Sequence, residues 1–481
     1  MTFTDLNFLF LFFPVFFIIY FLSKPEFRPV LIFIGSIIFF AFNNLLYLPL
    51  ILLIIWINFF LGKKIVNYRE KKYNAPLTIG VILNIFFIFL FKFANSINIG
   101  SFSQLSFLRT IEFIQKLVIP LGFSYITFQN ISYLVDVNNE VCEAENNYMN
   151  FAIFTLFFPK IIVGPIMRYG GMAADIKHPK VNASLAAEGL RRFIIGFAKK
   201  VLIADTIARA INPSFNLASP EFSTGIAWFM IIGYSIQLYF DFSGFTDMAI
   251  GMGQMMGFSL MENFNFPYIA ESISDFWRRW HISLSSWVRD YIFTPLEFKR
   301  RRVKFARQQT HILLAFLVVG LWHGLTPNYF AWGLLNGVFL AIEMTFLAKI
   351  LKKSWKPIRH AYLIAFLTIS WTIFRSSNLT YAIKFLGRLL GIGGEPILQP
   401  YILTSPLPII DPSVWIALMI GILFSLPLLP SLIKKFRSQS QKSIISKVGF
   451  VAYDLGLLCL FILSIASLTS STAVRNIYGG F

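Results

Sequence analysis

The sequence predicts an all-α polytopic membrane protein, and three observations support this fold class. Apolar side chains make up 56% of the 481 residues and charged side chains only 14%. The mean hydropathy is +0.67. Soluble domains contain about 45–50% apolar and about 25% charged residues, so this chain lies outside their range. The apolar residues also form runs that approach the roughly 20 residues a helix needs to cross a bilayer.

We expect roughly 11 to 13 membrane segments, because each apolar run is a candidate span. In chain order the runs are 6–23, 29–43, 45–62, 76–95, 116–135, 149–166, 187–211, 224–257, 310–325, 329–350, 360–375, 412–433 and 446–470. The run 224–257 is too long for one straight span. Spans pack laterally into one bundle, so we predict a single integral-membrane domain over residues 1–481.

Two of these runs are interrupted by residues that break helices. Pro120 lies in one, and Pro159, Gly164 and Pro165 lie in the other. Irregular backbone at membrane depth is tolerated only where protein or a water-filled cavity surrounds it. We therefore expect 116–135 and 149–168 to line an interior feature.

The charge distribution predicts an orientation in the membrane. The formal net charge is +19, and the basic residues gather in the short segments 63–72, 299–307, 349–359 and 434–442. This is the positive-inside pattern, which places those segments in the cytoplasm and argues against nucleic-acid binding. The first run follows Asp5 and precedes Lys24, so we expect a retained span with the N-terminus outside.

Few residues of this chain suit metal or cofactor chemistry. Cys142 and Cys459 are far apart and form no redox or metal motif. No histidine has a partner at metal-ligand spacing. We expect no metal site and no bound cofactor.

One histidine stands near the end of an apolar run. His323 follows Trp322 in the run that begins at Ile312. An ionisable side chain at membrane depth is costly and marks a functional site by default. Burial disfavours the imidazolium, and a neutral imidazole can accept a proton as a general base. The alternative is a histidine bonded to a backbone carbonyl between packed helices.

A second candidate site lies between Asn263 and Leu296, where aromatic residues, arginines and serines replace the apolar run. The residues that could bind a donor headgroup or support the site are Arg278, Arg279, Trp280, His281, Ser283 and Asp290. On one continuous helix the tryptophans would share one face, and Asp275 could pair with Arg278 or Arg279. An interfacial amphipathic helix is the alternative.

Two carboxylates lie within the long apolar run. Asp241 and Asp247 are six positions apart on either side of Gly244. Buried carboxylates in membranes are usually paired. We expect them to support the structure by pairing with arginines of 278–289.

Taken in order, these motifs resemble the membrane-bound O-acyltransferase superfamily. The resemblance covers about residues 1–380, and residues 381–481 are less characteristic. Within the superfamily, the sequence most resembles the bacterial branch that contains the alginate O-acetylation membrane protein. It resembles the teichoic-acid D-alanylation membrane protein more distantly. The motifs are Ile119–Gln129, Phe158–Tyr169, Asp241–Gly251, Asp275–Leu296, Gly320–Gly324 and Trp371–Arg375.

The resemblance implies a ring of helices around a central catalytic funnel in a bacterial plasma membrane. It implies that His323 and His281 are the two family histidines. It further implies an acyl thioester donor such as acetyl-CoA, a cell-envelope polysaccharide acceptor and a separate extracytoplasmic esterase-like (SGNH-type) transferase. The alginate-type branch continues with paired glycines where Pro295 and Leu296 here run into Glu297, so the alginate acceptor itself is not carried over.

The sequence therefore predicts a membrane-embedded O-acyltransferase that moves an acyl group, most simply acetyl, to a hydroxyl. D-alanyl transfer to a teichoic acid-type polymer is one alternative. A proton-coupled transporter, in which His323 and the two carboxylates relay protons, is an alternative of another class. It would require inverted repeats, which the sequence does not display.

Overall fold

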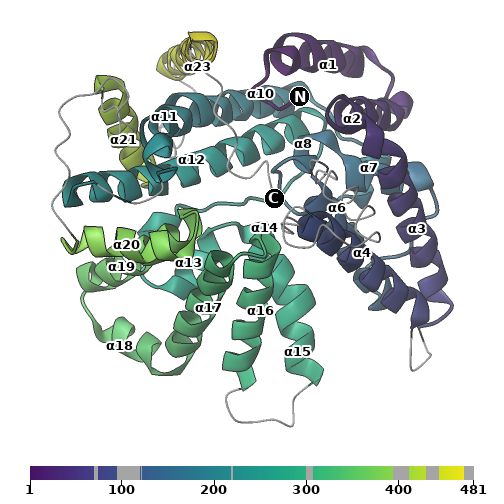
Figure 1. The fold of residues 1–481 in the computed structure, drawn as a ribbon. Coiled ribbons are helices and arrows are strands. Elements are labelled where there is room, and N and C mark those ends of the chain that lie inside the picture. Colours follow the sequence, from purple (N-terminus) through teal and green to yellow (C-terminus); the bar gives the residue numbers. More distant parts are fainter. Residues whose placement is uncertain are drawn as a thin grey trace, which may run out of the picture. The chain divides into compact units, whose positions relative to one another are not determined.

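The computed structural model describes residues 1–69, 74–94, 120, 122–217, 220, 222–299, 307–393, 411–428 and 444–470. The regular structure of these residues is helical, and their β pairing is limited to an isolated bridge between Phe264 and Trp280. The predicted all-α class is confirmed. The described residues form two compact units, and the helices of each can be followed in Figure 1.

The first unit contains Met1–Phe193 and Phe245–Glu262. Its helices are η1 (Phe8–Phe12), α1 (Phe13–Leu22), η2 (Pro25–Phe27), α2 (Arg28–Asn44), η3 (Leu45–Tyr47), α3 (Leu48–Val66), α4 (Ala75–Ala94), α6 (Phe123–Asn138), α7 (Tyr148–Leu156), α8 (Phe158–Ile161) and α9 (Ala173–Lys177). Helices α3, α4 and α6 pack against one another. Phenylalanine rings fill the contact between η1, α2 and α8, where Phe12 lies edge-on to Phe158 at 5.3 Å between ring centroids.

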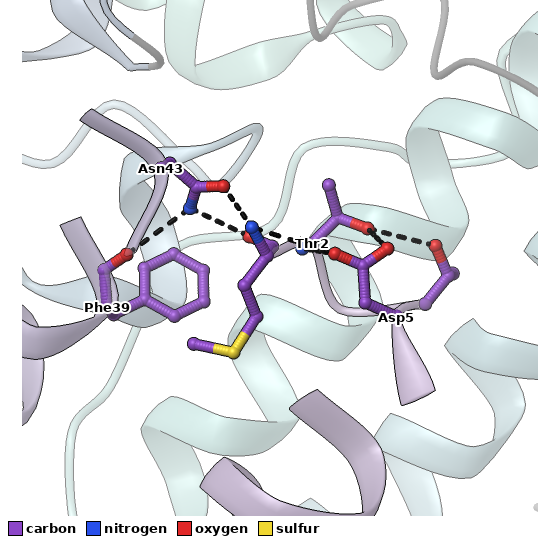
Figure 2. Close-up of polar contacts among 6 residues, drawn as sticks. Thr2, Asp5, Phe39 and Asn43 are labelled. Atoms are coloured by element: carbon purple, nitrogen blue, oxygen red, sulfur yellow. Dashed lines mark hydrogen bonds and ion pairs between the residues drawn. The ribbon is translucent and has the colours of Figure 1, made fainter. Parts of the chain in front are cut away.

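The N-terminal residues close one end of α2, as Figure 2 shows. Asn43 donates to the carbonyl oxygens of Met1, at 2.9 Å, and Phe39, at 3.2 Å, and accepts a hydrogen bond from the Met1 amine. The amide of Thr2 donates to the Asp5 carboxylate at 2.5 Å. These bonds satisfy polar groups that lie beside an otherwise apolar helix.

The described parts of the two interrupted runs lie in the interior of the first unit, and whether the runs line an interior feature stays a prediction. Helix α6 begins after Gly122, whose φ of 78° is left-handed and whose Cβ, if present, would lie 2.2 Å from the Ile161 carbonyl oxygen. Helix α7 ends at Leu156 and α8 is a single turn, after which the backbone is irregular. Side chains along α6, α7 and α8 are almost all buried.

The second unit contains Ile194–Gly244 and the described residues from Asn263 onward. Its helices are η5 (Lys199–Asp205), α11 (Thr206–Phe215), η6 (Pro267–Ile269), α13 (Ile273–Arg279), α14 (Ile282–Val288), η7 (Arg289–Phe293), α15 (Thr294–Lys299), α16 (Arg307–His323), α17 (Pro327–Ile342), η8 (Glu343–Leu347), α18 (Ala348–Lys353), α19 (Lys356–Arg375), α20 (Leu379–Leu389), α21 (Pro412–Phe424) and α23 (Ile444–Ser470). Helices α10 (Ala183–Ala198) and α12 (Thr224–Met255) contribute residues to both units.

Several helices are long and apolar enough to cross a membrane. Within the described ranges, five segments meet this criterion: Pro25–Val66, Ala75–Lys92, Thr224–Met255, Pro327–Lys353 and Val448–Ser470. Phe8–Leu22 and Pro412–Phe424 are shorter apolar helices. The run judged too long for one straight span is one α-helix of 32 residues. The total number of spans stays a prediction.

Candidate active site

The helical hairpin α16–α17 places His323. The two helices are joined by a short turn and pack closely along their length, as Figure 1 shows. Glycines allow this approach: a Cβ on Gly333 would lie 2.6 Å from the Phe316 carbonyl oxygen, and one on Gly320 would lie 2.5 Å from that of Tyr329. His323 ends α16, so a rise of 1.5 Å per residue puts it roughly 24 Å from Arg307, at the opposite end of the hairpin.

The imidazole of His323 is surrounded by aromatic rings. It is 8% exposed. The rings of Trp332 and Phe374 stand nearly perpendicular to it, with centroids at 5.3 and 5.0 Å, and Trp322 lies at 4.6 Å. Tyr329 stacks at 6.1 Å. This surrounding excludes bulk water from one side of the histidine and fixes the plane of its ring.

His281 lies at a break in the polypeptide rather than on a continuous helix. Helix α13 ends at Arg279, α14 begins at Ile282, and His281 between them has φ 44° and ψ 54°. The prediction of one helix with all tryptophans on a common face is therefore wrong. Asn263 stabilises the break, because its carbonyl and side-chain oxygens accept from the amides of Ile282, at 3.0 Å, and Ser283, at 3.1 Å.

The His281 side chain is buried and incompletely bonded. It is 3% exposed, its ring meets Phe242 edge-on at 4.6 Å, and its Nε2 atom has no hydrogen-bond partner among the described residues. Burial lowers the pKa of His281 to about 3, so the imidazole is neutral near pH 7. A left-handed non-glycine residue costs of order 1–3 kcal/mol, and such strain concentrates at functional sites.

Aromatic rings connect the surroundings of the two histidines. Trp277 contacts Trp332 at 5.9 Å between centroids, and Trp332 contacts His323. A continuous series of ring contacts also leads from His281 to His323. In order, its rings are those of Phe242, Phe264, Trp280, Trp371 and Phe374. Trp280, which is almost fully buried, lies in the middle of this series. The two predicted histidines thus belong to one aromatic cluster within the second unit.

The two arginines of the predicted motif have different surroundings. Arg279 pairs with Asp275 at 3.0 Å, one helical turn away, as predicted for one of the two arginines. It also donates to the Asn265 carbonyl oxygen at 3.2 Å. Arg278 is exposed and donates through Nε to the carbonyl oxygen of Ser274 at 3.2 Å. Arg279 is therefore held by its partners, whereas the terminal nitrogens of Arg278 are available.

Both arginines line a pocket of about 650 Å³. The pocket is formed by η6, α13, η8, α18 and the first turn of α19. Its lining residues are Ile269, Glu271, Ser272, Ser274, Asp275, Arg278, Arg279, Glu343, Met344, Ala348, Leu351, Lys352 and Arg359. Basic residues from two segments far apart in sequence thus meet around one cavity.

Glu343 is a site residue that sequence reasoning missed. It is 2% exposed, and its carboxylate accepts from the amides of Ile273, at 2.8 Å, and Ser274, at 2.9 Å. The Ser274 hydroxyl, at 2.6 Å, and the Tyr362 hydroxyl, at 3.1 Å, complete its partners. Glu343 thus caps the N-terminus of α13 from another helix. The available signal was a carboxylate inside the apolar run 329–350.

Three supporting residues of the predicted set have different environments. Trp322 is buried beside His323. Ser283 is fully buried in the first turn of α14, next to His281. Asp290 lies in η7 on the exposed side and pairs with Arg289 at 3.0 Å. Trp322 and Ser283 belong to the aromatic cluster's immediate surroundings, and Asp290 belongs to the surface.

The predicted pairing of Asp241 and Asp247 with arginines of 278–289 is wrong. Asp241 is buried and pairs with Lys200 at 2.7 Å, and Lys200 also contacts Asp205. Asp247 pairs with Arg192 at 2.8 Å in the first unit, and Arg192 also binds Glu262. Both carboxylates do serve ion pairs, but with cations of the run 187–211, which was read only as an apolar span.

The basic loop Lys299–Arg307 lies largely outside the described residues. Among the residues that are described, no three His, Cys, Asp or Glu side chains come together in a way that could hold a metal ion. The described part holds three buried imidazoles, those of His281, His311 and His323, and His311 pairs with Glu297.

Comparison with known proteins identifies the family. The model of the MBOAT (membrane-bound O-acyltransferase) family matches residues 141–383. The protein named "Probable alginate O-acetylase AlgI" of Pseudomonas aeruginosa is 38% identical over 401 residues, which are 82% of this chain and 75% of that protein. The peptidoglycan O-acetyltransferase of Helicobacter pylori is 34% identical over 80% of this chain and 79% of its own.

A third relative has a different acyl group in its name. The teichoic acid D-alanyltransferase of Bacillus subtilis is 34% identical over 50% of this chain and 63% of its own. The family match and the extent of these identities favour an acyltransferase over the transporter considered above. The chain belongs to the membrane-bound O-acyltransferase family and is an integral-membrane acyltransferase.

Proposed function

We propose that this protein transfers an acetyl group from a cytoplasmic acyl thioester toward O-acylation of a cell-envelope polysaccharide. The observation that carries the proposal is the position of His323. It is buried among aromatic rings at one end of the α16–α17 hairpin, and two ring contacts separate it from Trp277 beside the basic pocket. An imidazole in that position can accept a proton from a hydroxyl beside it.

In the proposed reaction His323 takes the proton of the acceptor hydroxyl. The hydroxyl oxygen forms a bond to the thioester carbonyl carbon, and the carbon–sulfur bond breaks. The departing thiolate takes the proton from the His323 imidazolium, so the products are an ester and a free thiol. General-base help of this kind is worth about 10²–10⁴ in rate.

The donor reaches the site from the side where the basic segments lie. Helix α16 starts beside the loop 299–307 and α17 returns toward the segment 349–359, so these basic segments share one end of the hairpin. The positive-inside rule makes that end cytoplasmic. The pocket with Arg278 and Arg279 lies near this end, and His281 follows these arginines in sequence. We assign His281 and the pocket to donor binding, and His323 to the transfer itself.

The relatives support the proposed acceptor. Two relatives are named for O-acetylation of alginate or peptidoglycan, which supports a polysaccharide acceptor in the envelope. The donor would be acetyl-CoA or another acyl thioester, and a separate extracytoplasmic esterase-like transferase would complete delivery. D-alanyl transfer is the second candidate, favoured by the similarity to the Bacillus subtilis protein.

Mass spectrometry of envelope glycans tests this proposal. Glycans from a strain carrying the gene should contain O-acetyl groups, and glycans from a strain without the gene should have lost them. Complementation with His323→Ala should leave the glycans unacetylated although the protein is inserted normally. Loss of D-alanyl instead of acetyl esters would select the second candidate, and unchanged ester content would refute both.

A further inference from the structure

The last turn of α19 forms part of the surroundings of His323. The ring of Phe374, which is buried, stands nearly perpendicular to the imidazole, with the two centroids 5.0 Å apart. The same ring contacts Tyr329 and Trp332, each at 5.3 Å between centroids. The carbonyl groups at a helix C-terminus lack partners within the helix, so the position of such a turn depends on outside contacts. The orientation of His323 therefore depends on what holds the end of α19.

Arg375, the last residue of α19, reaches the helices α11 and α12. Its guanidinium carbon lies over the ring of Phe215, 4.8 Å from the centroid, and over that of Tyr234 at 5.9 Å. Its Nη2 atom donates to Oδ1 of Asn212 at 3.3 Å. Phe215 and Tyr234 are almost fully buried, and their ring centroids lie 5.8 Å apart. The guanidinium thus packs on an aromatic surface that two other helices hold in place.

A second contact holds the end of α19 from the side of the α16–α17 hairpin. The side-chain amide of Asn328, in the first turn of α17, donates to the carbonyl oxygen of Ser376 at 2.9 Å. Both residues are buried. The end of α19 is thus joined to α17 through Ser376, and to α11 and α12 through Arg375. Because Phe374 is next to both residues in the helix, a loss of either contact would shift its ring.

The contacts of Arg375 depend on the shape of its side chain. Among the described residues it forms no ion pair. A cation at a helix C-terminus also interacts favourably with the macrodipole, but a lysine would serve that purpose as well. Stacking on rings while donating sideways to an amide oxygen uses the plane and the fork of a guanidinium, which lysine lacks. The residue type is therefore matched to a geometric role.

We propose that Arg375 is a positioning residue for His323. It holds the last turn of α19 so that the Phe374 ring keeps the imidazole in the orientation for proton transfer. Arg375 acts through Phe374 and touches neither donor nor acceptor. The inference rests on the proposed role of His323 and adds a residue that serves transfer without serving donor binding.

Acyl-transfer kinetics in proteoliposomes give the first test. Arg375→Gln should lower the maximal rate about tenfold, because a misplacement near 1 Å can cost on the order of 10². The donor concentration for half-maximal rate should not change. Arg375→Lys should recover only part of the lost rate. Lys384→Gln removes an exposed cation from the next helix, α20, and should act as the wild type.

A double-mutant cycle tests whether Arg375 acts through Phe374. The rate losses of Arg375→Gln and Phe374→Leu should not add in the double variant, because both disturb the same ring contact with His323.

NMR of protein with isotopically labelled histidine rings tests the same claim without any transfer. The signal of His323 is identified by its absence in His323→Ala. It should shift in Arg375→Gln because the facing ring moves, and the signals of the other histidines should stay. Asn212→Ala removes only the hydrogen bond to the guanidinium, so it should cause a smaller shift in the same direction. This milder variant decides the question if Arg375→Gln does not fold.

Several results would overturn the inference. They are an unchanged His323 signal in Arg375→Gln, a joint shift of all histidine signals, full recovery of the rate by Arg375→Lys, and additive losses in the cycle. A raised donor requirement in Arg375→Gln would place the residue on the donor side and contradict the inference as well. If the wild type transfers no acyl group, the proposed function fails, while the NMR signal still decides whether Arg375 holds the imidazole.

Discussion

His281 combines backbone strain and burial with a ring nitrogen, Nε2, that has no hydrogen-bond partner in the described part of the chain. Its φ of 44° and that of Phe266, at 45°, are two of the three positive φ values of non-glycine residues in the described part of the chain. Both flank the strand-like contact between Phe264 and Trp280. Since strain persists only where the surroundings impose it, the hydrogen bonds that Asn263 accepts from Ile282 and Ser283 are needed to hold this conformation.

The depressed pKa of His281 predicts how stability depends on pH. In the unfolded chain a histidine takes up a proton as pH falls through about 6.5, whereas folded His281 stays neutral down to about 3. The unfolded state binds more protons in this window, so the free energy of unfolding falls as pH decreases from about 6.5. Asparagine tolerates the left-handed backbone conformation of this position. The melting temperature of the His281→Asn variant should therefore fall by less between pH 7 and pH 5 than that of the wild type.

Thermal unfolding of the purified protein at the two pH values measures this difference. His178→Asn is the control, because it makes the same substitution at an exposed histidine. Identical losses of melting temperature in the wild type and His281→Asn would contradict a buried neutral imidazole.

Residue-level prediction from the sequence succeeded where partners lie on one helix. Asp275 and Arg279 are one turn apart, so their pairing follows from helical spacing alone. Lys200 and Asp241 lie on different helices, and no spacing rule connects them. Glu343 was missed for the same reason, because its partners on α13 come from a distant part of the sequence.

At the scale of elements, the contact between α16 and α17 sets the position of His323. The apolar runs 310–325 and 329–350 predicted two membrane segments, and both are helices. The distance between the two helices depends on Gly320 and Gly333. In the sequence these glycines are only small residues within apolar runs, so the close contact could not be predicted. A Cβ at Gly333 would lie within 2.6 Å of backbone on α16, which cannot yield as a flexible side chain can.

Gly333→Ala should therefore separate the hairpin and displace His323 from Trp332. A displacement near 1 Å can cost on the order of 10² in rate. Acyl-transfer assays in proteoliposomes should show a loss of that order with membrane insertion preserved. Gly449→Ala on α23, where nothing lies within 4 Å of the new Cβ, should retain wild-type activity. Equal activities of the two variants would mean that the helix contact does not position His323.

The break between α13 and α14 shows why element boundaries were the weaker part of the prediction. Helical spacing across Phe276 to Tyr291 favoured one helix, but His281 adopts the left-handed conformation and ends it. The bonds that stabilise the break come from Asn263, before α13. Tertiary contacts of this kind override local periodicity.

At the scale of the whole molecule, composition and charge predicted the class of protein well. The apolar runs indicated a polytopic membrane chain, and the ordered motifs indicated the family, to which the chain belongs. The two histidines could be selected because each is a polar residue in an unusual setting, apolar for His323 and aromatic for His281. The aromatic cluster that connects them arises from segments far apart in sequence that folding brings together.

The central claim is that His323 performs the transfer while His281 and the pocket serve the donor. A donor titration on His323→Ala and His281→Ala enzymes in proteoliposomes tests it most directly. We predict that His323→Ala loses at least about 10² in rate at every donor concentration, as removal of a general base requires. His281→Ala should instead raise the donor concentration needed for half-maximal rate. Rescue of the His323 variant, but not of the His281 variant, by saturating donor would contradict this division of roles.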